Sequence, residues 1–98
     1  AIQTPQDMSP RAIDADFAWS RVANGSKVLR KGDYGLEVEA LQSKLQQLGY
    51  NISNVDGDFG NRTRQEVIKF QGMTNQVQDG VVGKNTATAI DEALKKSS

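Results

Sequence analysis

Apolar residues recur every three or four positions in four stretches of the chain, which is the spacing of a helix with one buried face. These helices are expected to begin near residues 10, 36, 61 and 84. The residues predicted to face inward are Ala12, Ala15, Trp19, Val22, Val38, Leu41, Leu45, Leu48, Val67, Phe70, Ala89, Ile90, Ala93 and Leu94. The pattern predicts a mainly α fold, a small three-helix bundle with an extra N-terminal helix.

Two helix ends are marked by residues that tolerate a left-handed backbone. Gly49 follows the second helix, and Tyr50 is expected to fold back onto Leu45 in a Schellman arrangement. After the third helix, either Gly72 or Asn75 suits the same role. The sequence leaves these two alternatives open.

One short motif occurs twice, 23 residues apart. The matched residues are Asp56, Gly57, Phe59, Gly60 and Thr63 in the first copy and Asp79, Gly80, Val82, Gly83 and Thr86 in the second. Asp-Gly favours a turn because Asp bonds its own downstream backbone and Gly accepts positive φ. Each threonine falls in the first turn of the following helix, where its hydroxyl is expected to bond an unpaired backbone group. The motif predicts two turns that each start a helix.

β-prone residues flank both turns. Ile52 and Val55 precede the first turn, and Val77 and the pair at 81–82 surround the second. These two segments are expected to pair as a minimal β-hairpin, if any sheet forms. The fold should therefore hold little sheet.

Length and composition limit the chain to one small domain. Its 12 basic and 12 acidic residues cancel, so its 98 residues lack the positive field typical of nucleic-acid binding. The absence of Cys and His excludes His-ligated zinc sites, cysteine nucleophiles and Ser-His-Asp triads within the chain. No apolar run reaches the roughly 20 residues that span a bilayer. Because the chain starts at Ala1, it is expected to be processed or cut from a longer protein.

The acidic residues near the turns are Asp56, Asp58, Glu66 and Asp79. A pair of carboxylates can hydrolyse a glycosidic bond, but a bundle of this size has little room for a deep substrate cleft. We therefore expect no catalytic residue and no enzyme activity in this chain. The run 54–58 also resembles the start of a calcium loop, but Phe59 and Gln65 replace the glycine and the closing acid that such a loop requires. No metal site is expected.

Two other groups each allow a structural and a functional interpretation. Arg62, Arg64 and Lys69 form a basic strip on the third helix, either a solvated face or a place where Arg62 receives a carboxylate. Phe17 and Trp19 either pack the first helix onto the domain or form an exposed surface for a sugar or a partner.

A longer pattern of apolar residues, glycines and glutamines runs through the chain. It consists of Leu29, Arg30, Gly32, Gly35, Val38, Leu41, Gln42, Leu45, Leu48, Gly49, Tyr50, Asp56, Gly57, Phe59, Gly60, Thr63, Val67, Phe70, Gln71, Asp79, Gly80, Val82, Gly83 and Thr86. This pattern resembles the type 1 family of peptidoglycan-binding domains. The resemblance covers about residues 28–94 and implies a non-catalytic three-helix module that tethers cell-wall hydrolases or related proteins to peptidoglycan. Residues 1–27 would then form an N-terminal extension, residues 28–95 the domain and residues 96–98 a tail.

Two residues depart from the family pattern, which usually has Gly-Leu shortly before the second Asp-Gly. Asn75 replaces the glycine and is expected to keep the left-handed turn. Gln76 replaces the leucine, so Val77 or the N-terminal helix is expected to cover that part of the core.

Because most of the matching residues are apolar or glycine, the ligand contacts are expected beside them. The candidate binding residues are Asp58, Asn61, Arg62, Gln71 and Asn75, in one groove near the first turn and the third helix. Their donors and acceptors suit the amides, hydroxyls and carboxylates of peptidoglycan. The resemblance implies no cofactor, and it places such modules in the cell wall, in the periplasm or outside the cell, in bacterial and phage proteins.

The alternative function is a protein-interaction module that keeps this fold. Such a module would dock a catalytic domain or another protein through Phe17 and Trp19 of the N-terminal helix.

Overall fold

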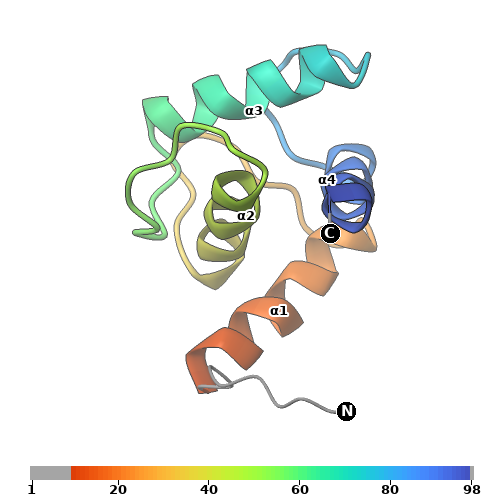
Figure 1. Ribbon diagram of the computed structural model, residues 1–98. Coiled ribbons are helices and arrows are strands. Elements are labelled where there is room, and N and C mark those ends of the chain that lie inside the picture. The colour runs from red at the N-terminus through yellow and green to blue at the C-terminus, as the bar shows by residue number, and fades with distance from the viewer. Residues whose placement is uncertain (1–9, 98) are drawn as a thin grey trace.

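The computed structural model describes the backbone of residues 10–97 and the side chains of residues 14–96. It contains α1 (Pro10–Ala23), α2 (Leu36–Gln47), α3 (Asn61–Met73) and α4 (Lys84–Ser97), joined by turns and loops (Figure 1). The prediction of a mainly α bundle is confirmed, and the helices begin where the apolar spacing placed them. None of the described helices is long and apolar enough to cross a membrane.

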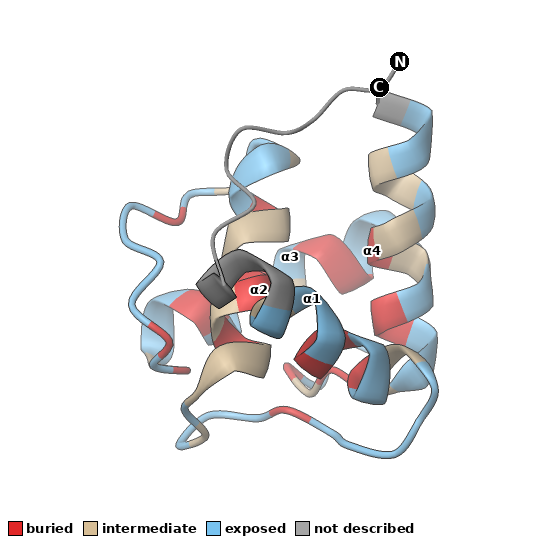
Figure 2. Ribbon diagram, turned by 90° about the horizontal axis from the view of Figure 1, so that it is seen from below, coloured by how far each residue is buried: buried red, intermediate tan, exposed pale blue. Residues whose placement is uncertain are grey.

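α2 makes contacts with every other helix. It packs against α1, α3 and α4, and α1 also contacts α4. In Figure 1, α3 crosses above α2, α1 slopes away below, and α4 is seen end-on beside them. Figure 2 shows buried residues on the inward faces of the helices. The core consists of Trp19, Val22, Leu29, Val38, Ala40, Leu41, Leu45, Ile52, Phe59, Val67, Phe70, Val82, Ala87 and Ile90.

Some residues expected to face inward are only half-buried. These are Ala15, Leu48, Ala89, Ala93 and Leu94, which lie at the margin of the core. The side chain of Ala12 lies outside the described residues.

The end of α2 matches the predicted Schellman arrangement. Gly49 has a φ of 92°, and its N–H donates to the carbonyl oxygen of Gln46 at 3.0 Å. The N–H of Tyr50 donates to the carbonyl oxygen of Leu45 at 2.9 Å. The Tyr50 ring then meets the edge of Phe70 in α3, with ring centres 5.9 Å apart. The glycine therefore directs the chain from α2 onto α3.

The end of α3 is formed by Asn75, which settles the alternative with Gly72. Asn75 has a φ of 60°, and the next N–H, that of Gln76, donates to the carbonyl oxygen of Gln71 at 2.8 Å. Of the two predicted ways of covering the nearby core, the one by Val77 is wrong, because Val77 is 78% exposed. Gln76 fills the position itself, since its Oε1 accepts the hydroxyl of Thr86 at 2.7 Å.

The predicted hairpin between residues 51–55 and the residues that flank the second turn is absent, and the described residues form no extended strand. Val82 pairs instead with Leu29, through N–H to carbonyl bonds of 3.0 and 2.8 Å. Both side chains are fully buried, and this pairing places them in the core together. A second isolated pair joins Tyr34 to Asp58.

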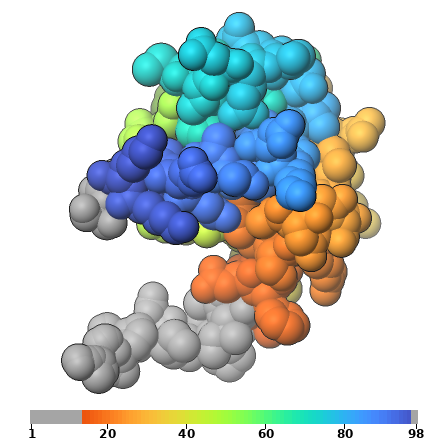
Figure 3. Space-filling view, turned by 90° about the vertical axis from the view of Figure 1, so that its right-hand side faces the viewer, coloured from red at the N-terminus to blue at the C-terminus, as the bar shows by residue number. Residues whose placement is uncertain are grey.

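Trp19 holds α1 against the rest of the bundle. The residue is 4% exposed, and its Nε1 donates to both carboxylate oxygens of Asp91 in α4, each at 3.1 Å. Lys44 Nζ in α2 lies 3.4 Å from Asp91 Oδ1 and 5.4 Å from the centre of the indole ring. Figure 3 shows α1 lying next to α4. The packing interpretation is thus confirmed for Trp19 and wrong for Phe17, which is 74% exposed.

Candidate ligand-binding site

The first Asp-Gly turn is built around the side chain of Gln42 in α2. Its Nε2 donates to the side chains of Asp56 and Thr63 and to the carbonyl oxygen of Asp58, each at 3.0 Å. Its Oε1 accepts the N–H of Gly57 at 2.8 Å. Gln42 is 1% exposed, so the turn is held from within the core.

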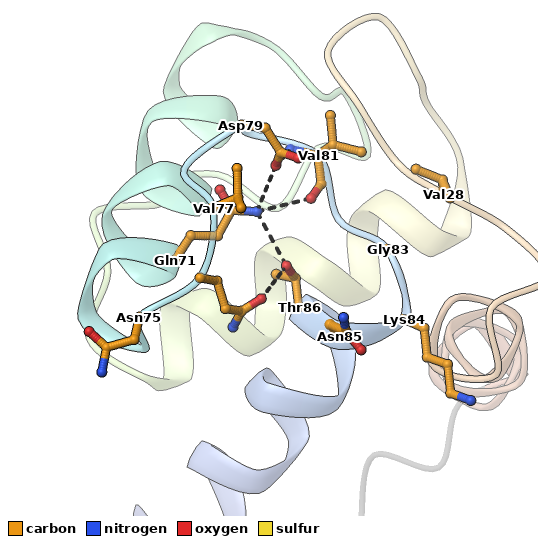
Figure 4. A pocket seen from close by; sticks show the side chains of 11 residues that line it. Val28, Gln71, Asn75, Val77, Asp79, Val81, Gly83, Lys84, Asn85 and Thr86 are labelled. Atoms are coloured by element: carbon orange, nitrogen blue, oxygen red, sulfur yellow. Dashed lines mark hydrogen bonds between the residues drawn. The ribbon is translucent and has the colours of Figure 1, made fainter.

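The second turn is built in the same way around Gln71 in α3. Its Nε2 donates to Asp79 Oδ1 and the carbonyl oxygen of Val81 at 3.0 Å, and to Thr86 Oγ1 at 3.2 Å (Figure 4). Its Oε1 accepts the N–H of Gly80 at 3.0 Å. The duplicated motif therefore corresponds to a duplicated hydrogen-bond network.

The two aspartates play the predicted part in these turns. Asp56 Oδ1 accepts the N–H of Asp58, and Asp79 Oδ1 accepts the N–H of Val81, both at 3.0 Å. The hydrogen bonds from the Asp58 N–H and from Gln42 lower the pKa of Asp56 below its ordinary value. Each turn is thus fixed by an aspartate side chain that bonds the backbone two residues further on.

The expectation for the two threonines is wrong. Their hydroxyl oxygens accept a hydrogen bond from a glutamine side chain, Thr63 from Gln42 and Thr86 from Gln71. The buried amide that bonds each turn therefore also bonds the threonine hydroxyl of the helix that follows it.

A hollow of about 590 Å³ lies beside the second turn, and we call it the second-turn hollow. Its walls come from the end of α3, the loop that follows, the start of α4 and Val28 on the opposite connection (Figure 4). The residues that line it are Val28, Gln71, Asn75, Gln76, Val77, Asp79, Val81, Gly83, Lys84, Asn85 and Thr86. Apolar and polar side chains are mixed in this lining.

A smaller hollow of about 250 Å³ lies beside the first turn, and we call it the first-turn hollow. The residues that line it are Gln42, Ile52, Ser53, Asn54, Asp56, Asp58, Gly60, Asn61, Arg62 and Thr63. The two hollows share no lining residue, but they occupy matching places beside the duplicated networks.

The five candidate binding residues do not lie in one groove. Asp58, Asn61 and Arg62 line the first-turn hollow, whereas Gln71 and Asn75 line the second-turn hollow. The first group lies at the start of α3 and the second at its end, and ten residues of α-helix span about 15 Å. Gln71 is also 1% exposed, and both ends of its amide are bonded to the turn.

Arg62 belongs to an ion-pair cluster around the buried carboxylate of Glu66. Glu66 Oε1 accepts the N–H of Asn51 at 3.0 Å, while Oε2 lies 3.1 Å from Lys69 Nζ and 3.7 Å from Arg62. Burial raises the pKa of Glu66, but the Asn51 bond and the two cations outweigh it and leave the pKa lowered. Arg62 and Lys69 of the basic strip therefore pair with Glu66, and the Arg62 side chain stays 57% exposed.

Sequence reasoning missed the residues that line the second-turn hollow from the start of α4. Lys84 and Asn85 are exposed polar residues in the first turn of a helix, which is a common place for them and carries no signal of its own. Gln42 was also missed as an organising residue. The apolar-Gln pair that occurs in both α2 and α3 was the signal for it.

Comparison with known proteins gives a consistent picture. The model of the family described as putative peptidoglycan binding domain matches residues 34–90, more than half of the chain. The type VI secretion system spike protein VgrG3 of Vibrio cholerae is 37% identical in an alignment of 78 positions that covers 66% of this chain and 8% of that protein. The N-acetylmuramoyl-L-alanine amidase CwlM of Mycobacterium tuberculosis is 35% identical over 57 residues, which are 58% of this chain and 14% of that protein.

The fold is likewise shared with solved structures. The SleB N-terminal domain superposes with a TM-score of 0.67 at 33% sequence identity, covering 68% of this chain and 92% of that one. The chain therefore spans most of this single solved domain but only a small part of the two longer relatives.

Proposed function

Because this chain belongs to the family of peptidoglycan-binding domains, we propose that it binds bacterial peptidoglycan and leaves the covalent bonds of the polymer intact. The matching family is described as a binding domain, and this supports a targeting role. The chain also has no His or Cys with which to build the catalytic sites considered above. The structural roles of the acidic residues near the turns also support it. Asp56 and Asp79 hold the turns, and Glu66 is buried among cations.

The observation that carries the proposal is the second-turn hollow. Pockets for small ligands usually measure about 300–1,000 Å³, and this hollow, at about 590 Å³, falls in that range. Asn75 and Asn85 offer amide donors and acceptors, Lys84 offers a cation, and Val77 and Val81 offer apolar contact. Peptidoglycan carries amides, carboxylates and short apolar side chains, so its stem peptide matches this lining.

Binding at such an open site is expected to be weak for a single contact. An affinity of about 1 μM corresponds to about −8 kcal/mol, and a shallow hollow should not exceed it. Peptidoglycan repeats the same unit many times, so weak binding still concentrates the domain on an insoluble wall.

A linked or associated hydrolase is the partner that this role supports. One of the relatives named above is an amidase, and the chain spans only 14% of it. We propose that a module with this function works in the cell wall or outside the cell. It would do so in the periplasm of a bacterium or as part of a phage-encoded protein.

The second candidate function, docking of a protein through α1, is favoured by one observation. Phe17 projects from α1 and is 74% exposed, whereas Trp19 is buried against Asp91 and leaves no ring face for a partner. Docking would therefore depend on Phe17.

The proposal is tested by sedimenting the chain with purified insoluble peptidoglycan and assaying the supernatant for released muropeptides. We expect binding without release. The double variant Asn75→Gly and Asn85→Ala should weaken binding about tenfold, the loss of two ordinary hydrogen bonds. Glycine at 75 keeps the left-handed backbone, so this variant removes the side chain without disturbing the end of α3.

The exposed Gln47→Ala variant is the matched control and should bind normally. Muropeptide release by the isolated chain would contradict the non-catalytic role. Absence of sedimentation by a folded chain would overturn the proposed function and favour a protein partner at Phe17.

A further inference from the structure

The duplicated turns carry different linings, and this difference points to two ligand positions. The networks match residue by residue, but Asp58 at the first turn corresponds to Val81 at the second. In the same register Asn61 corresponds to Lys84, and Arg62 to Asn85. The scaffold is thus repeated while the groups presented to a ligand are changed.

We propose that the first-turn hollow is a second binding position, which takes a neutral N-acetylated sugar ring of the glycan, while the second-turn hollow takes the stem peptide. This inference rests on the proposed function and adds a ligand class for each hollow. A single sugar ring is a compact group, and the first-turn hollow, about 250 Å³, is less than half the size of the other.

Charge separates the two ligand classes. The first-turn hollow is lined by two carboxylates, Asp56 and Asp58, and one cation, Arg62, which already faces Glu66 at 3.7 Å. A carboxylate of a stem peptide would be repelled there, whereas hydroxyl groups donate readily to carboxylate oxygens. The second-turn hollow has one carboxylate, Asp79, and the cation Lys84. It is therefore the better place for a charged peptide.

An exposed aromatic residue, Tyr34, pairs with Asp58, which lines the first-turn hollow. The N–H of Gly35 donates to Gly57, and the N–H of Phe59 donates to Asp33, both at 2.9 Å. These bonds flank the pair Tyr34–Asp58, so the two side chains stand next to each other on one face of the ladder.

Tyr34 is 80% exposed, so its ring is open to a ligand. An aromatic ring next to a small polar hollow provides a flat apolar surface for the face of a sugar, while the hollow bonds its hydroxyl and acetamido groups. The second-turn hollow has no aromatic residue in its lining. Tyr34 therefore supports the binding of a sugar at the first-turn hollow and not at the second-turn hollow.

The experiment is a titration of the ¹⁵N-labelled chain with the disaccharide of N-acetylglucosamine, a probe that has the sugar and no peptide. Amide shifts are expected at Tyr34, Asp58 and Asn61, with little change at Asn75 and Asn85. The Tyr34→Ala variant should bind the disaccharide about threefold more weakly or worse. Its fold should survive, because the pairing with residue 58 uses backbone groups.

Phe17→Ala is the matched control, since it removes an equally exposed ring from α1. It should leave the titration unchanged. Absence of shifts, or shifts confined to the second-turn hollow, would overturn the inference. Sedimentation with insoluble peptidoglycan, run in parallel, reports on the proposed function separately: a chain that sediments but ignores the disaccharide refutes only the sugar position.

Discussion

Gln42 and Gln71 make the same four hydrogen bonds to the two Asp-Gly turns, although they lie 29 residues apart and the turns lie 23 apart. Each amide nitrogen has three acceptors within reach of its two N–H groups, and each amide oxygen accepts one backbone N–H. The turns therefore keep their shape independently of any ligand. The proposed binding residues around them would therefore sit on a rigid base, which would lower the entropy lost on binding.

Replacing Gln42 by Ala should lower the free energy of unfolding by about 2 kcal/mol or more, because each buried polar group left without a partner costs about 1–3 kcal/mol. The N–H of Gly57 is the group most affected, since its bond to Gln42 is buried. Urea unfolding measures the change. Gln47→Ala is the control, because Gln47 is exposed and makes only a 3.4 Å contact with Ser43. Equal stability of the two variants would show that the network contributes little.

The contact between Trp19 and Asp91 should contribute measurably to stability. Asp91→Ala leaves the buried indole N–H without an acceptor, which is expected to cost about 1–3 kcal/mol. Thermal unfolding measures this loss, and quenching of Trp19 fluorescence by acrylamide should increase at the same time. The neighbouring Glu92→Ala variant removes an exposed carboxylate and should change neither quantity. If both variants behave alike, the contact does not hold α1.

Glu66 should make the domain less stable at acid pH than at neutral pH. Its folded pKa is lowered, because the Asn51 N–H, Lys69 and Arg62 outweigh the effect of burial. The stability it provides is complete above its unfolded pKa, about 4.3, and is lost as pH falls through the lower folded pKa. Glu66→Gln should therefore lose less stability than the unaltered chain when urea unfolding is repeated at pH 7 and at pH 3.

The pKa of Asp56 is also lowered, so Asp56 also contributes stability that is lost in acid, and the total loss is not specific to Glu66. The comparison between variants isolates Glu66, and Glu92→Gln, at an exposed position, should follow the unaltered chain. An identical loss in Glu66→Gln and Glu92→Gln would contradict the assignment.

Two glycines with similar backbone angles should respond differently to Ala. Both have positive φ, 76° for Gly57 and 92° for Gly49, so each substitution costs about 1–2 kcal/mol of backbone strain. A Cβ at Gly49 meets no atom within 4 Å, whereas one at Gly57 lies 3.0 Å from Glu39 Cγ and 3.3 Å from the carbonyl oxygen of Gly35. Gly57→Ala should be the more destabilising in urea unfolding. The reverse order would show that the first turn can shift without cost.

Local features of this fold were predictable from the sequence because they depend on neighbouring residues. The helix starts follow apolar spacing, the bend at Gly49 follows from its lack of a side chain, and the bonds of Asp56 and Asp79 reach only two residues along the chain. In each case the interacting groups lie within one turn of backbone. The prediction of a mainly α bundle succeeded for the same reason.

Features that depend on distant residues were missed or misjudged. Val82 was expected to pair across a hairpin, but it pairs with Leu29, 53 residues earlier, where both side chains are buried. The glutamine networks escaped notice because the 23-residue repeat places Gln65, an exposed residue, opposite Gln42. The candidate site was divided for a similar reason. Asn61 and Asn75 were placed in one groove because both are close to α3 in the sequence, but they lie at opposite ends of this helix.

The contact of α1 with α4 also bears on the order in which the chain assembles. The networks at the two turns join residues at most 21 positions apart, whereas Trp19 and Asp91 are separated by 72. Closing the longer loop costs about 1 kcal/mol more in chain entropy, so we expect α1 to dock after both turns have formed. Native-state hydrogen exchange should then show α1 amides opening at lower free energy than those of α3, and equal protection would rule this order out. The N-terminal helix would thus be the last helix to pack, onto a bundle whose other three helices are already in place.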